Sequence, residues 1–225
     1  MMTTTKAEAS GRIRVILVED HPMFRERLAE LINVEPDMEV CGQAETVHEA
    51  MELVRRAKPD LAIVDITLKD GSGLELIKDL KAQSIQLPVL VLSMHQESLY
   101  AERILQAGAK GYVSKNQAAS EVMKAIRQIL AGDVYLSPEV TAGLLKRIAA
   151  SGGSSETVGM NSLTDRELEI FQLIGRGKGI PEIGRLMNLG NSTVETYRAR
   201  IRTKLGIKNA AGLYSVAATW VRDNG

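Results

Sequence analysis

The sequence predicts a doubly wound α/β domain with a five-stranded parallel sheet, followed by a small all-α domain of four helices. Five short apolar segments rich in β-branched residues occur between residues 13 and 113, and each precedes a segment with helical apolar spacing. From residue 162 onward only helical spacing recurs. The alternating pattern is typical of a parallel sheet, and its end predicts a second domain.

The expected strands are nearly continuous in apolar residues, which is typical of strands that are covered on both faces. They are Ile13–Val18, Met38–Gln43, Leu61–Val64, Val89–Leu92 and Gly111–Val113. Helices are expected around residues 23–34, 47–57, 74–82, 99–107 and 119–131, where apolar residues recur at i, i+3, i+4 and i+7. Because parallel strands need crossover connections, we expect these helices on both sides of the sheet.

The chain after residue 133 is expected to leave the first domain. A short helix is predicted at 141–150 and a flexible Gly/Ser segment at 151–155. The first helix of the second domain is predicted to begin after Thr164, because Thr164 and Glu167 have the spacing of a capping box.

Three further helices are predicted in the second domain. Pro181 suits the first turn of a helix at 182–187, and another helix begins near Ser192. The last helix is expected at 210–221. Its expected buried residues are Leu213, Val216, Ala217 and Trp220.

Charge is distributed unevenly along the chain, although 28 Lys and Arg balance 28 Asp and Glu overall. Residues 1–136 contain 16 basic and 20 acidic residues, and residues 161–225 contain 10 basic and 6 acidic residues. An excess of positive charge on the second domain favours double-stranded DNA as its partner. Every apolar run is far shorter than the roughly 20 residues that span a bilayer, so we expect no membrane partner and a cytoplasmic location.

Acidic residues follow two of the expected strands. Glu19 and Asp20 follow the first strand, and Asp65 follows the third. Because the carboxyl ends of parallel strands meet at one edge of the sheet, we expect these three carboxylates to converge. Such a cluster calls for a divalent cation, and hard oxygen ligands favour Mg²⁺. A carboxylate beside the ion can accept a phosphoryl group, which makes Asp65 the candidate nucleophile.

A hydroxyl and an ammonium follow two further expected strands, the fourth and the fifth. Ser93 follows the fourth strand and Lys115 the fifth, so both can neutralise charge on a transferred phosphoryl group. Each residue also has a simpler interpretation. Asp20 could cap the helix that begins at Pro22. Ser93 could be a turn residue and Lys115 a solvated surface cation. The joint pattern favours a reactive site.

These residues lie in motifs that resemble the receiver domain of response regulators. The motifs are Val18-Glu19-Asp20-His21-Pro22, Val64-Asp65-Ile66, Leu92-Ser93-Met94-His95 and Gly111-Tyr112-Val113-Ser114-Lys115. The resemblance covers residues 11–134 and implies the flavodoxin-like strand order of receivers. It also implies that Mg²⁺ is held by Glu19, Asp20, Asp65 and the backbone carbonyl of Thr67.

The same resemblance implies roles for three other side chains. Lys115 would pair with the phosphoryl group, Ser93 would move to bond one of its oxygens, and Tyr112 would repack inward and carry the signal to the outer face. Simple strand packing is the alternative for Tyr112. The chain departs from the receiver pattern twice, because Lys69 and Asn116 stand where many receivers have proline, in the second case in a cis bond. Both departures affect loop geometry and leave the reacting groups in place.

The second domain resembles the four-helix DNA-binding domain of LuxR-type regulators over residues 162–225, joined by a linker at 135–161. The motifs are Leu163-Thr164-Asp165-Arg166-Glu167, Thr193-Val194-Glu195-Thr196-Tyr197 and Lys204-Leu205-Gly206. With the receiver, this is the NarL/FixJ architecture of two-component response regulators. The resemblance implies that the helix at 192–205 enters the major groove of DNA in a helix-turn-helix arrangement.

Side chains of that helix separate into phosphate contacts and base contacts. Phosphate contacts are expected from Thr193, Arg198, Arg200, Arg202 and Lys204. Base contacts are expected from Glu195, Thr196 and Ala199, because a carboxylate can accept from cytosine and a methyl group can touch thymine. Ser192 and Glu195 also have capping-box spacing, so Glu195 has a structural alternative.

The expected protein is therefore a two-component response regulator and transcription factor, and not an enzyme. A histidine kinase would phosphorylate Asp65, which would promote homodimers and sequence-specific DNA binding. The resemblance places the dimer surface of the second domain on its last helix, with Leu213 and Trp220.

Two other classes of protein are weighed against this one. A haloacid-dehalogenase-type enzyme needs a second aspartate two positions after the nucleophile, where this chain has Thr67. A constitutive DNA-binding protein whose receiver serves only for dimerisation is disfavoured because Asp65 and Lys115 are intact.

Overall fold

The computed structural model describes residues 11–69, 71–94, 97–138, 140–143, 160 and 162–224. Contacts along the chain divide it into two compact units, Met1–Leu92 with Ala107–Tyr135 and Ser93–Gln106 with Leu136–Gly225. The domain boundaries expected from the sequence, 11–134, 135–161 and 162–225, stay predictions.

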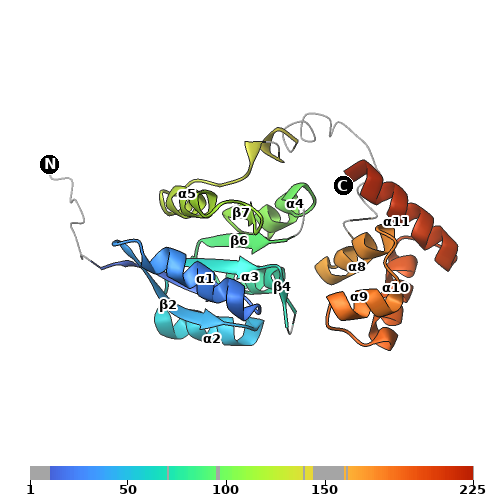
Figure 1. Ribbon diagram of the computed structural model, residues 1–225, viewed down its shortest axis with the longest axis horizontal. Coiled ribbons are helices and arrows are strands. Elements are labelled where there is room, and N and C mark those ends of the chain that lie inside the picture. The colour runs from blue at the N-terminus through green and yellow to red at the C-terminus, as the bar shows by residue number, and fades with distance from the viewer. Residues whose placement is uncertain are drawn as a thin grey trace. The chain divides into compact units, whose positions relative to one another are not determined.

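A five-stranded sheet with the strand order β2-β1-β3-β6-β7 lies at the centre of the receiver-like fold (Figure 1). Its strands are β1 (Ile13–Val18), β2 (Met38–Ala44), β3 (Leu61–Asp65), β6 (Val89–Ser93) and β7 (Gly111–Ser114). The pairs β1·β2, β1·β3 and β3·β6 are parallel. Each expected strand is confirmed, and the order is the flavodoxin-like one that the resemblance implied.

Helices follow the strands as the alternating pattern predicted. They are α1 (Pro22–Asn33), α2 (Val47–Ala57), α3 (Gly73–Ala82), α4 (Glu97–Ala107) and α5 (Ala119–Leu130). Residues of α1 and α5 join Val15 and Leu17 of β1 in one core cluster. Ile16 and Val18 are as deeply buried and point to the opposite face, because side chains alternate along a strand. On that side α2 contacts β1, β2 and α3.

A local capping signal marks the end of the loop that follows β3. Ser72 and Glu75 form a capping box at the start of α3, with the Ser72 side chain accepting from the backbone amide of Leu74. Inside the loop, β4 (Thr67–Leu68) and β5 (Gly71–Ser72) form an antiparallel pair. This pair was not expected, because a strand of two residues has no apolar period that a sequence pattern could detect.

The chain after α5 runs along the edge of the sheet. The amide of Tyr135 donates to the carbonyl of Lys110 at 2.9 Å, and the amide of Tyr112 donates to the carbonyl of Tyr135 at 3.0 Å. Tyr135 itself is buried, and its hydroxyl donates to Glu121. A Cβ on Gly111 would lie 2.8 Å from the carbonyl oxygen of Tyr135, so glycine permits this close approach. The first residue of the expected linker is thus held by β7.

The second unit contains the four helices expected beyond residue 162. They are α8 (Asp165–Gly175), α9 (Ile180–Leu186), α10 (Asn191–Lys204) and α11 (Ala210–Asn224). The capping box of Thr164 and Glu167 is confirmed at the start of α8, and Pro181 lies in the first turn of α9. The prediction that Val216 is buried is wrong, because its side chain is 40% exposed.

Part of the expected linker lies outside the described residues. Of the helix predicted at 141–150, residues 141–143 are described and are helical. The rest of that helix and the Gly/Ser segment at 151–155 fall in the part that is not described. Among the described helices, none combines the length and the apolar character that crossing a membrane requires.

Candidate functional site

Parallel pairing brings the carboxylates together at the carboxyl edge of the sheet. Val18 of β1 is level with Val64 of β3, so the next residues, Glu19 and Asp65, come side by side. Asp65 is level with Leu92 of β6, which places Ser93 one residue further along the same edge. The predicted convergence of these strand ends is therefore a consequence of strand register.

Lys115 lies between two buried carboxylates. Its Nζ is 2.5 Å from Oε2 of Glu19 and 2.7 Å from Oδ2 of Asp65, and all three side chains are at most 5% exposed. The ring of Phe24 lies under the ammonium, with Nζ 4.6 Å from its centroid. The alternative of a solvated surface cation is therefore wrong for Lys115. One buried cation faces two buried anions, so the pocket retains negative charge.

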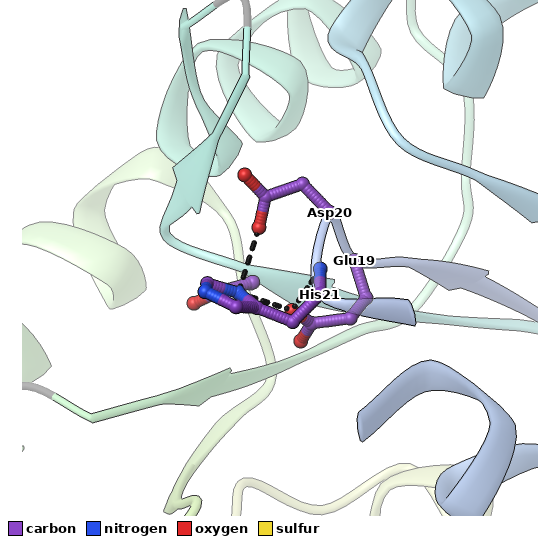
Figure 2. Close-up of side chains that lie close together, drawn as sticks. Glu19, Asp20 and His21 are labelled. Carbon is purple, nitrogen blue, oxygen red and sulfur yellow. Dashed lines mark hydrogen bonds and ion pairs between the residues drawn. The ribbon is translucent and has the colours of Figure 1, made fainter. Parts of the chain in front are cut away.

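Glu19, Asp20, His21 and Asp65 each offer a ligand atom, and these atoms lie within 4.8 Å of one another. Figure 2 shows the carboxylates of Glu19 and Asp20 both approaching one nitrogen of the His21 ring. Oδ1 of Asp20 is buried and has no partner with hydrogen-bond geometry, although Nδ1 of His21 lies 2.9 Å from it. A buried carboxylate oxygen without a hydrogen bond fits a cation ligand, since such an atom is costly to leave unpaired. The pocket can therefore hold a metal ion.

The alternative role of Asp20 as a helix cap is wrong. The N-cap of α1 is His21, and no side chain makes a capping hydrogen bond there. Pro22 in the first turn removes one amide that a cap would satisfy. The Asp20 side chain is consequently free of the helix end and faces the pocket.

Burial raises the pKa of Asp65 from its ordinary value of 3.8 to about 6. The positive charge of Lys115 and its hydrogen bond oppose this rise, as does a backbone hydrogen bond from Thr67, and the negative charge of Glu19 adds to it. The carboxyl is therefore balanced between desolvation and a single cation. Near neutral pH most of it is ionised, which is the form that a nucleophile needs.

A direct titration tests this balance. In the metal-free protein we expect the carboxyl carbon of Asp65 to titrate near pH 6 in a carbon-detected NMR experiment, because burial opposes ionisation. Adding a divalent cation is expected to lower this pKa, since the ion favours the charged form. A midpoint at pH 4 without metal would contradict this balance, because it would show that Lys115 and the hydrogen bonds offset the desolvation of Asp65 fully.

The other predicted receiver residues lie on β6, β7 and the loop that follows β3. Ser93 and Tyr112 are buried at the end of β6 and within β7, with 1% and 0% of their surface exposed. Thr67 begins β4, two residues beyond Asp65. A Cβ on Gly73 would lie 2.0 Å from the carbonyl oxygen of Asp65, so the start of α3 holds this loop tightly against β3.

The helix α10 presents most of the predicted DNA-contacting side chains to solvent. Thr193, Glu195, Thr196, Ala199, Arg200 and Lys204 are exposed and Arg202 is half-buried. Val194 and Ile201 are fully buried and attach the helix to its own unit. The capping-box alternative for Glu195 is wrong, because α10 begins at Asn191 after Gly190 and has no side-chain cap.

Two basic residues of α10 have partners inside the unit. Arg198 is buried, with its guanidinium 5.2 Å from the ring of Tyr214 and Nη1 3.2 Å from Oε1 of Glu195. Lys204 donates to Oε2 of Glu167 at 2.6 Å. Burial acts to raise the pKa of Glu167, but the hydrogen bonds from Lys204 and Thr164 outweigh it and lower that pKa. Both basic residues thus hold α10 in place.

Comparison with known proteins finds a family match for each of two segments of the chain. Residues 15–127 match the response regulator receiver domain, and residues 161–217 match the bacterial regulatory proteins of the luxR family. The chain is 36% identical over 205 residues to a putative transcriptional regulator of Pseudomonas aeruginosa, which is 91% of this chain and 96% of that protein. The chain belongs to the NarL/FixJ family of two-component response regulators.

Two further relatives agree with this. This chain is 33% identical over 196 residues to the DNA-binding transcriptional activator DevR/DosR of Mycobacterium tuberculosis. The alignment covers 87% of this chain and 89% of that protein. A crystal structure of a LuxR-family two-component response regulator from Aurantimonas sp. SI85-9A1 is 33% identical, with a TM-score of 0.58. That match covers 62% of this chain and 99% of the other.

Arg25 is a residue of this response regulator's site that sequence reasoning missed. Its Nη1 donates to the backbone carbonyl of Glu19 at 2.6 Å, and its Nη2 lies 2.8 Å from Oε1 of Glu45. Lys69, one of the two departures from the receiver pattern, also pairs with Glu45. At the other departure, the amide of Asn116 donates to Oγ of Ser114 at 3.3 Å, a bond that proline could not make. Arg25 and Glu45 are 20 residues apart, so no local pattern links them.

The last helix of this response regulator buries one of the two residues that were expected at its dimer surface. Leu213 is fully buried, and Trp220 is half-buried with its ring edge-on to Phe171 at 5.7 Å between centroids. Leu213 therefore cannot contact a partner. The large apolar side chains that α11 exposes are Tyr214 and Val216.

Proposed function

We propose that a histidine kinase transfers a phosphoryl group to Asp65 in the presence of Mg²⁺, and that this promotes dimerisation and sequence-specific DNA binding. One observation supports the proposal above all others. The single ammonium of Lys115 lies within 2.7 Å of both Asp65 and Glu19, in a pocket that retains negative charge. This arrangement suits a nucleophile that must receive a highly charged group.

The chemistry follows from the positions of the groups. A carboxylate oxygen of Asp65 attacks phosphorus, the bond from phosphorus to the nitrogen of the phosphohistidine breaks, and an acyl phosphate forms. Glu19, Asp20, Asp65 and the carbonyl of Thr67 would hold Mg²⁺, which when bound neutralises charge on the transferring oxygens. Lys115 stays within reach of the new phosphoryl oxygens, and the Ser93 hydroxyl donates to one of them.

The added charge then changes the packing around the site. Lys115 exchanges its bond to Asp65 for one to the phosphoryl group, and Ser93 and Tyr112 repack with it. Tyr112 donates its amide to the carbonyl of Tyr135, the last residue of the first unit, so a shift of β7 reaches the start of the linker. Two receiver conformations with different affinities for the phosphoryl group are sufficient for such a switch.

On DNA, α10 would lie in the major groove with its exposed face toward the bases. Glu195, Thr196 and Ala199 read base edges, and Thr193, Arg200 and Arg202 contact phosphates. Arg198 and Lys204 attach α10 to its neighbours through Tyr214 of α11 and Glu167 of α8, and contribute less to the phosphate contacts than the sequence suggested.

Arg200→Ala and Arg198→Ala separate these two roles. We expect Arg200→Ala to reduce the slope of log affinity against log salt by about one and to leave stability unchanged, because it removes one phosphate contact. We expect Arg198→Ala to destabilise the second unit by about 1–2 kcal/mol, since it removes a buried stem and its stacking on Tyr214. Urea unfolding followed by the fluorescence of Trp220, the one tryptophan of the chain, measures the second effect. Equal stability losses in both variants would contradict this division of roles.

The proposal is tested with the full chain and acetyl phosphate as the phosphoryl donor. Fragments selected from genomic DNA serve as the target, and binding is followed by gel shift with and without donor and Mg²⁺. We expect a phosphoryl mass on Asp65, a shift toward dimers and tighter DNA binding, all dependent on Mg²⁺. Labelling without any change in oligomeric state or DNA affinity would refute phospho-control. An unlabelled protein that binds DNA equally well would establish a constitutive regulator.

A further inference from the structure

His21 lies over the acidic pocket, although the metal set that the family implies contains only oxygen ligands. Its Nδ1 is 2.9 Å from Oδ1 of Asp20 and 3.1 Å from Oε1 of Glu19. Figure 2 shows the ring reaching between the two carboxylates, with both contacts made by the same nitrogen. The outer part of the ring faces solvent, since the side chain is 70% exposed.

The backbone of His21 is itself tied to the pocket. Pro22 disfavours helical dihedrals at the preceding residue, and His21 accordingly has φ −88° and ψ 107°. The amide of His21 donates to Oε1 of Glu19 at 3.0 Å, so the main chain is tied to the same carboxylate that the ring contacts. The main chain of His21 is therefore fixed beside the two carboxylates that its ring contacts.

Lys115 leaves a defined set of ligand atoms for an ion. It engages Oε2 of Glu19 and Oδ2 of Asp65, which occupies one oxygen of each carboxylate. Oδ1 of Asp20 is buried without a partner of hydrogen-bond geometry, and Nδ1 of His21 forms an ion pair with it at 2.9 Å. Nitrogen and oxygen donors thus meet on the open side of the pocket.

The spacing of these donors fits one coordination shell. For metal–ligand bonds of about 2.1 Å, neighbouring ligands of an octahedral ion are about 3.0 Å apart. The separations of 2.9 Å and 3.1 Å between Nδ1 and the two carboxylate oxygens have this value. A hydrogen bond from the ring to a carboxylate has the same length, so distance alone does not separate a ligand from a donor. The affinities of different divalent ions do distinguish a metal ligand from a hydrogen-bond donor.

We propose that Nδ1 of His21 is a metal ligand, which makes this pocket a mixed nitrogen–oxygen site that prefers divalent transition-metal ions such as Co²⁺ and Ni²⁺ over Mg²⁺. The inference rests on the metal site proposed above and specifies its selectivity. Imidazole nitrogen adds to the affinity for Co²⁺ and Ni²⁺, whereas Mg²⁺ favours oxygen ligands and keeps its waters. A ring that only donates a hydrogen bond would support every divalent ion alike.

Binding of the metals alone to the tag-free full chain tests the proposal. Dissociation constants for Mg²⁺ and Ni²⁺ are measured by calorimetry for wild type, His21→Asn and His48→Ala. His21→Asn places an amide near the position of Nδ1 and so keeps a hydrogen-bond donor without an imidazole ligand. His48 is the matched control, because it is an exposed histidine of α2 whose Nε2 lies 3.5 Å from Glu52.

We expect His21→Asn to weaken Ni²⁺ binding by about tenfold or more, and to change Mg²⁺ binding by less than about threefold. His48→Ala is expected to change neither. With Mn²⁺ as a paramagnetic probe, pulsed EPR is expected to show a directly bound ¹⁴N in wild type and in His48→Ala, and none in His21→Asn.

The outcomes test separately whether His21 is a metal ligand and whether the metal site exists. Equal losses for Ni²⁺ and Mg²⁺, or no loss for either, would overturn the role of His21 as a ligand while leaving the metal site intact. Mn²⁺ bound without a nitrogen coupling would do the same. If wild type binds none of these ions, the metal site of the proposed function fails together with the inference. Circular dichroism of His21→Asn checks that the variant is folded.

Discussion

Asp65→Asn is expected to abolish phosphoryl incorporation and at the same time to make the metal-free protein more stable at pH 8. The first effect follows because an amide is not a nucleophile for phosphorus under these conditions. The second follows because ionised Asp65 is buried beside Glu19, and only Lys115 compensates the two charges. In the variant, Lys115 keeps Glu19 as its partner.

The pH dependence of this stability gain has a definite sign. Burial raises the pKa of Asp65 from 3.8 to about 6, so the folded state binds the proton more tightly than the unfolded state. The side chain therefore costs nothing below pH 4, and its cost grows until the pH passes 6. At pH 8 the full difference corresponds to about 2–3 kcal/mol, which is the expected gain in Asp65→Asn.

Urea unfolding of wild type and variant at pH 4.5 and pH 8, without divalent ions and followed by far-UV circular dichroism, measures the difference. Asp133→Asn is the control, because Asp133 is an exposed acid in the turn after α5. We expect this control to change stability by less than about 0.5 kcal/mol at either pH. A variant less stable than wild type at pH 8 would show that the pair of Asp65 and Lys115 stabilises the fold and that desolvation is a minor effect.

Gly175→Ala is expected to destabilise the second unit severely and to remove DNA binding with it. Gly175 is the last residue of α8, where α8 packs against α11. A Cβ there would lie 2.4 Å from the carbonyl oxygen of Ala217 and 2.6 Å from Cγ2 of Val221. Because a backbone oxygen cannot move aside as a side-chain end can, the two helices must separate, at a cost of about 3 kcal/mol or more.

Trp220 reports this change directly, since its ring packs edge-on against Phe171 across the same helix pair. We expect a lower urea midpoint by tryptophan fluorescence and an unchanged pKa of Asp65 in the other unit. Gly179→Ala is the matched control, because the nearest atom to its added Cβ would be Cδ of Pro181 at 3.9 Å. If both variants unfolded at the same midpoint, the close approach at Gly175 would have no energetic consequence.

The strands and the chemical groups at their ends could be predicted from the sequence because the relevant signals are local. A buried parallel strand is a short apolar run, and the residue that follows it must lie at the carboxyl edge. Glu19, Asp65 and Lys115 follow such runs, so their meeting needed no knowledge of side-chain packing. The capping box of Thr164 and Glu167 is equally local, since both its bonds close within one turn.

Predictions failed where the apolar period of a helix did not decide whether a particular side chain is buried. Arg198 was expected to flank the apolar stripe of α10, yet it lies four residues after Val194 and three before Ile201 and belongs to the buried face, while its phosphate contact stays a prediction. A long side chain with an apolar stem can occupy such a position when a ring and a carboxylate receive its guanidinium. On α11, Val216 was expected in the core, and the packing against α8 instead buries Leu213 and Ala217.

By itself the sequence determined the order of strands and helices, the two kinds of domain and the group of side chains at the carboxyl edge of the sheet, because periodicity and strand ends are properties of consecutive residues. Only the tertiary structure decided that Lys115 bridges two carboxylates, that Arg25 ties Glu19 to Glu45 and that Tyr135 pairs with β7. These contacts join residues that are distant along the chain. Their existence depends on how the elements pack, which no local pattern records.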